Sequence, residues 1–525
     1  MRTLLRVGFA LAIAASCPSL LATRVSAQNT GAVPRFEPAP CPPLAPQLSN
    51  ARCGYLVVPE DRSRPLDRAI RNFVAIIPAR SADKASDPIV YLGTGPGGIA
   101  SSEAASLVDA GINDRRDLIV MNQRGQYLSE PALTCMSIDA FTRELVGLRF
   151  YSKATKRAHL AATAECRRDL LAKTTNLGAY NSSESASDFA DLRIALGIAE
   201  WNVLGVSYGT DLSQAYVRDH PEGVRSMVLD SVVPVSTILP DYWGSTRAGF
   251  DNLFAACAAE PACNAAWPHL EPIFSKLVNR LETDPRITTV HDPATGEDVK
   301  VVLDGGALVD WLRDQSRANN PGLATAPDLI HKLARGRPEA LRAIAGYRVG
   351  LAPPPVMGAP AASYGLGYGV VCREQYPFPR RELSAAGKQA FPFYPTSITE
   401  QAVSTWAYNN DDCRRIWRVP AAVDAHRPLT TNLPALLVSG SFDAVTDLDF
   451  AKKVAATLAK GTIISIPGIG HFVIANSQCA QTVVRSFFDN PDAPDTGCVG
   501  SLKPPPFIPF SSAEESSGET LPIID

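Results

Sequence analysis

Short apolar runs alternate along much of the chain with segments whose apolar residues recur at helical spacing. Runs typical of buried strands cover residues 55–58, 70–77, 88–92, 118–122, 201–206, 224–229, 434–440 and 462–466. Helical spacing follows several of them, as at residues 211–220, 448–458 and 481–488. Strands that alternate with helices usually pair in parallel and are buried on both faces. The pattern therefore predicts an α/β fold, with a mostly parallel sheet covered by helices on both faces.

The pattern changes between residues 235 and 427. Helical spacing is present at 307–317 and 328–335, but Pro353-Pro354-Pro355 and a Gly/Tyr-rich run at 364–368 interrupt it. We interpret this segment as a mainly helical cap inserted into the sheet domain. The core then has two parts, residues 28–234 and 428–500, followed by a Pro/Ser-rich tail at 501–525. Residues 28 to about 50 are rich in proline, and we expect them to be irregular.

The first 27 residues have the features of a secretion signal. Arg2 and Arg6 precede an apolar run at 7–15, and Val25-Ser26-Ala27 offers small residues before a cut at Gln28. The apolar run is too short to span a bilayer. Cys17 nearly matches a lipoprotein signal, so lipid anchoring is a minor alternative. We expect an exported protein, periplasmic or extracellular, without an integral membrane segment after signal removal.

Charge and cysteine usage agree with export. The formal net charge of −3 falls to about −6 once the three arginines of the signal are removed, and no basic tract suggests a nucleic-acid partner. Ten of the eleven cysteines lie beyond the signal, and neighbours in sequence pair most simply as Cys41/Cys53, Cys135/Cys166, Cys257/Cys263, Cys372/Cys413 and Cys479/Cys498. No C-x-x-C spacing or histidine cluster accompanies them, so we predict structural disulfides and no metal or cofactor.

The strand at 201–206 leads into Gly205-Val206-Ser207-Tyr208-Gly209, a turn of the form G-x-S-x-G. Small residues on both sides of a serine let the backbone turn sharply and expose the hydroxyl above the edge of a sheet. A bare match to this pattern is often a plain turn. The strand before it and the helical segment after it favour Ser207 as a nucleophile.

Two further residues complete a triad in sequence order. Asp443 follows the strand at 434–440, and His471 follows the last strand between glycines. The order Ser, Asp, His is that of α/β-hydrolases, in which the histidine accepts the serine proton and the acid orients the histidine. Competing acids are Asp447 and Asp449 nearby, and Asp230 at the end of another strand.

The loop 93–98, Gly-Thr-Gly-Pro-Gly-Gly, follows a strand and is rich in glycine. It lacks the Lys-Ser/Thr of a phosphate-binding P-loop and the spacing of a dinucleotide fingerprint. We interpret it as an oxyanion loop, in which backbone N–H groups closely approach a developing negative charge. The predicted donors are the N–H group of Tyr208 and that of Gly97 or Gly98.

These motifs together resemble exported prolyl and tripeptidyl aminopeptidases, the TAP-like serine hydrolases of the α/β-hydrolase superfamily. The resemblance covers roughly residues 41–500 and rests on the stretches 205–210, 228–230, 93–98, 123–125 and 372–374, together with the C-terminal block. The family usually has Gly-Gly-Pro-Gly-Gly where this chain carries Thr94, and Asp-x-Arg-Gly-Thr-Gly where it reads Asn122-Gln123-Arg124-Gly125-Gln126-Tyr127. These departures leave the triad untouched and lie near the expected substrate pocket.

The resemblance implies an enzyme that releases short N-terminal units from peptides through an acyl-enzyme intermediate. Such an enzyme needs a carboxylate for the substrate's ammonium group, because an unpaired buried charge is costly. Glu374, beside Cys372 in the predicted cap, is the candidate, with a solvated surface glutamate as the alternative. Two other functions stay open: a carboxylesterase acting on small acyl or aryl esters, and a non-catalytic binding protein on a hydrolase scaffold.

Overall fold

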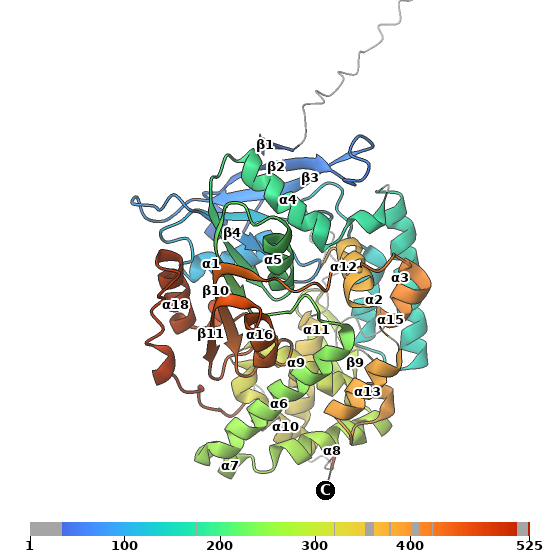
Figure 1. The fold of residues 1–525 in the computed structure, drawn as a ribbon. Helices are drawn as coiled ribbons and strands as arrows, with labels where there is room; N and C mark the ends of the chain where they lie inside the picture. The colour runs from blue at the N-terminus through green and yellow to red at the C-terminus, as the bar shows by residue number, and fades with distance from the viewer. Residues whose placement is uncertain are drawn as a thin grey trace, which may run out of the picture. The chain divides into compact units, whose positions relative to one another are not determined.

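The described residues form a nine-stranded sheet in the order β1-β2-β3-β5-β4-β6-β7-β10-β11 (Figure 1). The computed structural model describes residues 34–524 apart from 175, 320, 352–361, 377, 379, 402–408, 423 and 512–522. The strands are β1 (Arg35–Ala39), β2 (Arg52–Pro59), β3 (Ala69–Ile77), β4 (Ile89–Leu92), β5 (Leu118–Met121), β6 (Trp201–Val206), β7 (Val224–Asp230), β10 (Thr431–Gly440) and β11 (Leu458–Ile466). β1, β2, β3 and β5 pair antiparallel in that order, and β5, β4, β6, β7, β10 and β11 pair in parallel. The predicted mostly parallel sheet is confirmed.

Both faces of the sheet are covered by helices, as the continuous apolar runs require. Neighbouring residues of β6 alternate between the two faces: Val203 packs into the cluster that contains Leu212, and Leu204 into the cluster that contains Leu107. On the first face lie α4 (Ser182–Ala195) and α5 (Tyr208–Asp219), and on the second lie α1 (Ala100–Asp109) and α18 (Gln478–Asp489). Figure 1 shows α4 and α5 side by side on one side of the sheet and α18 on the other.

The parallel strands fix where functional loops can gather. The carboxyl ends of β4, β6, β7, β10 and β11 meet at one edge, because these strands run in the same direction. In open α/β sheets, ligands bind outside this edge. The loops that carry Ser207, Asp443 and His471 all leave from it.

Other helices connect or cover these strands. Between β5 and β6 lie α2 (Met136–Leu145), α3 (Lys153–Leu171) and the short η2 (Leu177–Ala179). After β10 come α16 (Leu448–Ala455) and, beyond β11, α17 (Val473–Asn476). Short 3-10 turns are η1 (Pro46–Leu48), η3 (Leu239–Asp241) and η6 (Val499–Ser501).

The segment between β7 and β10 is mainly helical, as predicted, but it also contains a β-hairpin. Its helices are α6 (Tyr242–Ala259), α7 (Pro261–Ala266), α8 (Leu270–Thr283), α9 (Gly305–Ala318), α10 (Gly322–Ala334), α11 (Pro338–Leu351), α12 (Tyr364–Val370), α13 (Arg380–Ala390), α14 (Thr396–Thr399) and α15 (Asn409–Asp412), with π-helical turns η4 (Val371–Gln375) and η5 (Cys413–Trp417). The hairpin pairs β8 (Arg286–Asp292) with β9 (Glu297–Leu303). Residues 33–525 form one compact unit, so the boundaries at 234/235 and 427/428 stay predictions.

Within the described part of the chain, five disulfides join Cys41–Cys53, Cys135–Cys166, Cys257–Cys263, Cys372–Cys413 and Cys479–Cys498. This is the pairing of sequence neighbours that we predicted.

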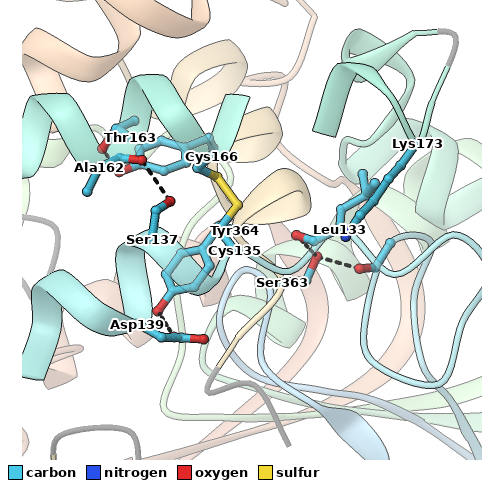
Figure 2. The surroundings of a disulfide bond; sticks show 12 residues. Leu133, Cys135, Ser137, Asp139, Ala162, Thr163, Cys166, Lys173, Ser363 and Tyr364 are labelled. Carbon is cyan, nitrogen blue, oxygen red and sulfur yellow. Dashed lines mark hydrogen bonds between the residues drawn. A yellow bond between two sulfur atoms is a disulfide. The ribbon is translucent and has the colours of Figure 1, made fainter. Parts of the chain in front are cut away.

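Figure 2 shows one of these disulfides, which joins Cys135, just before α2, to Cys166 on α3. Beside it, the hydroxyl of Tyr364 donates to Asp139 Oδ1 at 2.6 Å. The disulfide and this bond attach α2 to both α3 and α12, so helices far apart in sequence support one another next to the sheet.

One expectation about local structure was wrong. The proline-rich stretch before residue 50 is not wholly irregular, because Arg35–Ala39 forms β1 at the edge of the sheet. Pro38 is tolerated there, since an edge strand does not need every N–H group for pairing. The predicted signal at 1–27, including Cys17, and residues 512–522 and 525 of the tail lie outside the described residues.

Candidate active site

Ser207 lies at a sharp turn between β6 and α5, as the motif predicted. Its backbone has φ +56° and ψ −124°, a strained conformation for a residue with a side chain. Gly209 allows the turn to pack tightly, because a Cβ atom there would collide with the carbonyl oxygen of Leu92 on β4. The Ser207 side chain is thereby held at the carboxyl edge of the sheet, with the residue 8% exposed.

Asp443 and His471 are in direct contact. His471 Nδ1 and Asp443 Oδ2 are 2.8 Å apart, in a hydrogen bond in which the ring N–H donates to the carboxylate. Asp443 is almost fully buried, and burial alone would raise its pKa. The charge of His471 and hydrogen bonds from His471 and Thr446 outweigh burial and hold the pKa of Asp443 below its ordinary value. The carboxylate therefore stays ionised next to the imidazole.

Thr446, which the sequence did not single out, completes the contacts of this acid. Its hydroxyl donates to Asp443 Oδ2 at 2.8 Å and lies 3.3 Å from His471 Nδ1. The backbone N–H groups of Val445 and Thr446 both donate to Asp443 Oδ1, at 2.7 and 2.9 Å. Each carboxylate oxygen is thus fully engaged, which fixes the side chain toward His471.

The competing acids have other partners. Asp447 accepts a hydrogen bond from the hydroxyl of Ser245 at 2.9 Å, and the exposed Asp449 pairs with Lys452 at 2.8 Å. Neither contact involves the histidine, so the geometry favours Asp443 among the acids after β10.

Asp230 connects the serine turn to the segment that follows His471. Its carbonyl oxygen accepts from the N–H of Ser207 at 2.9 Å, and its carboxylate accepts from the N–H groups of Val473 and Ile474 at 3.0 and 2.9 Å. Burial raises the pKa of Asp230 to about 6, although these N–H groups oppose the rise. Asp230 therefore positions backbone on both sides of the site and does not orient the imidazole ring.

The glycine-rich loop lies next to the start of α12. Gly97 has φ +90°, and a Cβ atom at this position would collide with the carbonyl oxygen of Ser363. The N–H of Ser363, the N-cap of α12, donates to the Gly97 carbonyl at 2.8 Å, so the loop is bonded to the start of that helix. Tyr208 is the first residue of α5, where N–H groups have no acceptor within the helix. Both predicted oxyanion donors thus belong to ordered backbone at the sheet edge.

The departures from the family motifs have local explanations. The Thr94 hydroxyl and N–H both donate to the carboxylate of Glu103 on α1. Asn122 accepts from the N–H of Ser101 and donates to the carbonyl oxygen of Tyr127. An amide can do both, whereas an ionised aspartate could only accept. Thr94 and Asn122 therefore stabilise the local backbone through these hydrogen bonds.

Glu374 is buried and not on the surface. The residue is 6% exposed, and its carboxylate accepts from the N–H and hydroxyl of Ser182 at 2.9 and 2.6 Å. The Ser182 hydroxyl is also 2.8 Å from the hydroxyl of Tyr208, the residue after the nucleophile. Glu374 is thereby linked to the serine turn through a chain of two hydroxyl groups, and the solvated-surface alternative is wrong.

In the described part of the chain, no three His, Cys, Asp or Glu side chains are grouped so that they could hold a metal ion. None of the described helices is long and apolar enough to cross a membrane.

Two protein families match parts of the chain. The alpha/beta hydrolase fold family matches residues 87–280, and the TAP-like protein family matches residues 399–499, which include Asp443 and His471. The predicted α/β-hydrolase fold and the resemblance to TAP-like hydrolases are confirmed.

Curated relatives extend over most of the chain. Serine protease Hip1 of Mycobacterium tuberculosis is 25% identical, over 87% of this chain and 89% of the relative. Putative hydrolase YuaR of Escherichia coli is 24% identical, over 86% of this chain and 88% of the relative. Tripeptidyl aminopeptidase of Streptomyces coelicolor is 30% identical over 35% of each chain. The match to these enzymes identifies a hydrolase related to serine peptidases.

Proposed function

The chain is a TAP-like α/β hydrolase, and we propose that it is an exported aminopeptidase that releases short N-terminal units from peptides. Ser207 is the nucleophile, His471 the general base and acid, and Asp443 the residue that orients His471. The observation that carries this proposal is the 2.8 Å hydrogen bond between Asp443 and His471, at the sheet edge where the strained turn presents Ser207.

In the proposed mechanism, the Ser207 hydroxyl attacks the scissile carbonyl carbon while His471 Nε2 takes the hydroxyl proton. The N–H groups of Tyr208 and of Gly97 or Gly98 stabilise the oxyanion that forms. His471 then donates the proton to the leaving amine, and the C–N bond breaks. Water then attacks the acyl carbon while His471 takes one of its protons; the ester bond to Ser207 Oγ breaks, the acyl fragment leaves as a carboxylic acid, and His471 returns the proton to Ser207.

Asp443 acts throughout this cycle by fixing the histidine. Its carboxylate accepts the Nδ1 proton, which leaves Nε2 free to face the serine, and its negative charge stabilises the imidazolium. The backbone and hydroxyl donors around Asp443 keep it ionised during turnover.

The burial of Glu374 supports a peptide substrate with a free N-terminus. A buried carboxylate linked to the serine turn offers a partner for an ammonium group, which an ester substrate would lack. The disulfide between Cys372 and Cys413 secures the turn that carries it.

Export is supported by the five disulfides, because such bonds persist in oxidising compartments. The expected cut before Gln28 is tested by the N-terminal sequence of the protein recovered from a periplasmic or culture fraction. A mature chain that starts at residue 28 supports export, and an uncut cytosolic chain contradicts it.

The test of function uses one chromogenic peptide with a free N-terminus, the same peptide N-acetylated, and a short-chain p-nitrophenyl ester. We expect turnover of the free peptide, a loss of at least tenfold in kcat/KM on acetylation, and no turnover of either peptide by Ser207→Ala. Equal turnover of both peptides with faster ester hydrolysis would replace the aminopeptidase by a carboxylesterase. Failure of Ser207 to react with a fluorophosphonate would favour a non-catalytic protein.

A further inference from the structure

The glycine-rich loop at residues 93–98 needs contacts from outside itself to be ordered. Four of its six residues are glycine, and Gly95 and Gly97 have positive φ values of +131° and +90°. Glycine loses more conformational freedom on folding than any other residue. N–H groups that stabilise an oxyanion must nevertheless be held in place before the reaction. The loop therefore needs fixed partners on neighbouring elements.

Glu103, on the first turn of α1, is such a partner. Its Oε2 accepts from the N–H of Thr94 at 2.9 Å, and its Oε1 accepts from the Thr94 hydroxyl. A Cβ atom at Gly93 would lie 2.9 Å from Glu103 Oε2, and one at Gly98 would lie 2.8 Å from Glu103 Oε1. Both ends of the loop therefore pack against the same carboxylate.

The loop uses its N–H groups in two different ways. The N–H of Thr94 is bonded to Glu103, whereas those of Gly97 and Gly98 make no hydrogen bond with any described residue. A Cβ atom at Gly95 would collide with the nitrogens of both Gly97 and Gly98, so the loop folds back on itself at this point. The first N–H group thus anchors the loop, and the last two are left to bind an oxyanion.

Glu103 is itself held by two neighbouring strands. The hydroxyl of Tyr91, a buried residue of β4, donates to Glu103 Oε2 at 2.7 Å. Burial raises the pKa of Tyr91 well above its ordinary value, and the charge of Glu103 raises it further, so the hydroxyl keeps its proton and remains a donor. Asn122, just after β5, accepts from the N–H of Ser101 at 2.8 Å and so fixes the start of α1. The carboxylate is therefore presented to the loop from a rigid support.

Resting on the proposed function, we propose that Glu103 is a positioning residue that holds the loop 93–98 in the conformation that stabilises the oxyanion. Thr94, where the family usually has glycine, gives the loop a hydroxyl contact with Glu103 that a glycine would lack. Asn122, the other departure from the family motifs, fixes the helix that carries Glu103. The two departures thus act on the same support.

The first test is Glu103→Ala in the full, disulfide-intact enzyme, assayed with the chromogenic peptide that has a free N-terminus. We expect kcat to fall about 10- to 100-fold while KM stays within threefold, because oxyanion donors act in the transition state. Labelling of Ser207 by a fluorophosphonate should slow by a similar factor, since the phosphoryl oxygen takes the place of the oxyanion. Asp109→Ala is the matched control, because Asp109 is an exposed acid at the end of the same helix and accepts from Gln47. It should change neither rate.

Two conservative variants test whether the hydrogen bonds carry the effect. Glu103→Gln can keep all three contacts, because its oxygen accepts from the Thr94 N–H and the Tyr91 hydroxyl while its amide donates to the Thr94 hydroxyl oxygen. We expect it to restore kcat to within threefold of the wild type. Thr94→Val loses only the hydroxyl contact and should lower kcat about 3- to 10-fold, with no further loss when it is added to Glu103→Ala. A further loss in that double variant would overturn the proposal.

A stability measurement separates positioning from a merely structural role. Glu103→Ala leaves the buried hydroxyl of Tyr91 unpaired, which should lower the melting temperature. Tyr91→Phe removes this hydroxyl, so the double variant Glu103→Ala with Tyr91→Phe should recover melting temperature but not kcat. Recovery of kcat together with melting temperature would show a structural residue and overturn the proposal.

A short-chain p-nitrophenyl ester distinguishes this proposal from the proposed function. If the wild type cleaves the free peptide and Glu103→Ala keeps the same kcat, the positioning role is wrong and the aminopeptidase stands. If the wild type cleaves only the ester and Glu103→Ala lowers that kcat at least tenfold, the positioning role stands and the aminopeptidase fails. A wild-type protein that cleaves neither substrate overturns both.

Discussion

Asn319 is bonded to the main chain on both sides of the His471 α-carbon. Its Nδ2 donates to the carbonyl oxygen of His471 at 2.8 Å, and its Oδ1 accepts from the N–H of Gly470 at 2.6 Å. One turn earlier, the carbonyl oxygen of Ser316 accepts from the N–H of His471 at 2.7 Å. The segment between β7 and β10 therefore does more than cover the site, because the end of α9 fixes the backbone of the candidate base.

Replacement of Asn319 should impair the chemical step more than substrate binding. In Asn319→Ala, both bonds to the histidine loop are lost, and we expect kcat to fall about 10- to 100-fold while KM changes less than threefold. Steady-state kinetics with the free peptide measures this split. Asn279→Ala is the control, since the side-chain amide of Asn279 donates to the carbonyl oxygen of Ser275 on its own helix, α8. A rise in KM alone would contradict a positioning role for Asn319.

Asp443→Asn should reduce kcat by about 10³- to 10⁴-fold, because an amide cannot hold the histidine in the required tautomer or stabilise its charge. Asp447→Asn is the matched comparison, since Asp447 follows the same strand but bonds to Ser245. We expect that variant to retain kcat within a few-fold. The reverse order of effects would transfer the acid role to Asp447.

Loss of the disulfide between Cys372 and Cys413 should destabilise the protein and weaken recognition of the free amine. The bond joins two π-helical turns, one of which carries Glu374. For Cys372→Ser with Cys413→Ser, we expect a loss of about 2–4 kcal/mol in the free energy of unfolding. We also expect a reduced preference for free over acetylated peptide. The same double change at Cys41 and Cys53, remote in sequence from Glu374, should preserve that preference; loss of preference in both would point to general destabilisation.

Asp304, the N-cap of α9, should make stability fall as pH rises from about 4 to 6. Burial raises the pKa of Asp304 to about 6, against hydrogen bonds from the N–H groups of Ala307 and Phe150. Between the ordinary value of 3.8 and about 6, the folded chain binds more protons than the unfolded chain, so deprotonation destabilises the fold by up to about 3 kcal/mol.

Asp304→Asn cannot ionise and should lack this loss. The free energy of unfolding of variant and wild type is measured with denaturant at pH 4 and at pH 7. Between these two values, the variant should gain stability relative to the wild type. The exposed Asp449→Asn should show no comparable shift. A difference for Asp304→Asn that does not change with pH would contradict the raised pKa.

The sequence predicted those parts of the molecule that local patterns encode. Apolar runs predicted the parallel strands, and G-x-S-x-G predicted the sharp turn after β6. The structure has that turn, with a strained backbone at Ser207 and with Gly209 packed closely against the carbonyl oxygen of Leu92. The hydrogen bond between Asp443 and His471 also followed from their order after two strands that end at the same edge.

Residues that act across long sequence distances were missed. Asn319 lies 152 positions from His471, and no local pattern relates them. Glu374 lies 192 positions from Ser182, whose N–H and hydroxyl donate to it, and only the fold brings the two together. β1 was missed because Pro38 disfavours a strand locally and only pairing with β2 makes one.

The central claim is that Ser207 is the nucleophile, and mass spectrometry after exposure to a fluorophosphonate tests it most directly. We predict one adduct, mapped to the peptide that contains Ser207, with no adduct in Ser207→Ala and much slower labelling in His471→Ala. A folded wild-type protein that stays unlabelled, or one labelled at another serine and equally well in Ser207→Ala, would contradict the account.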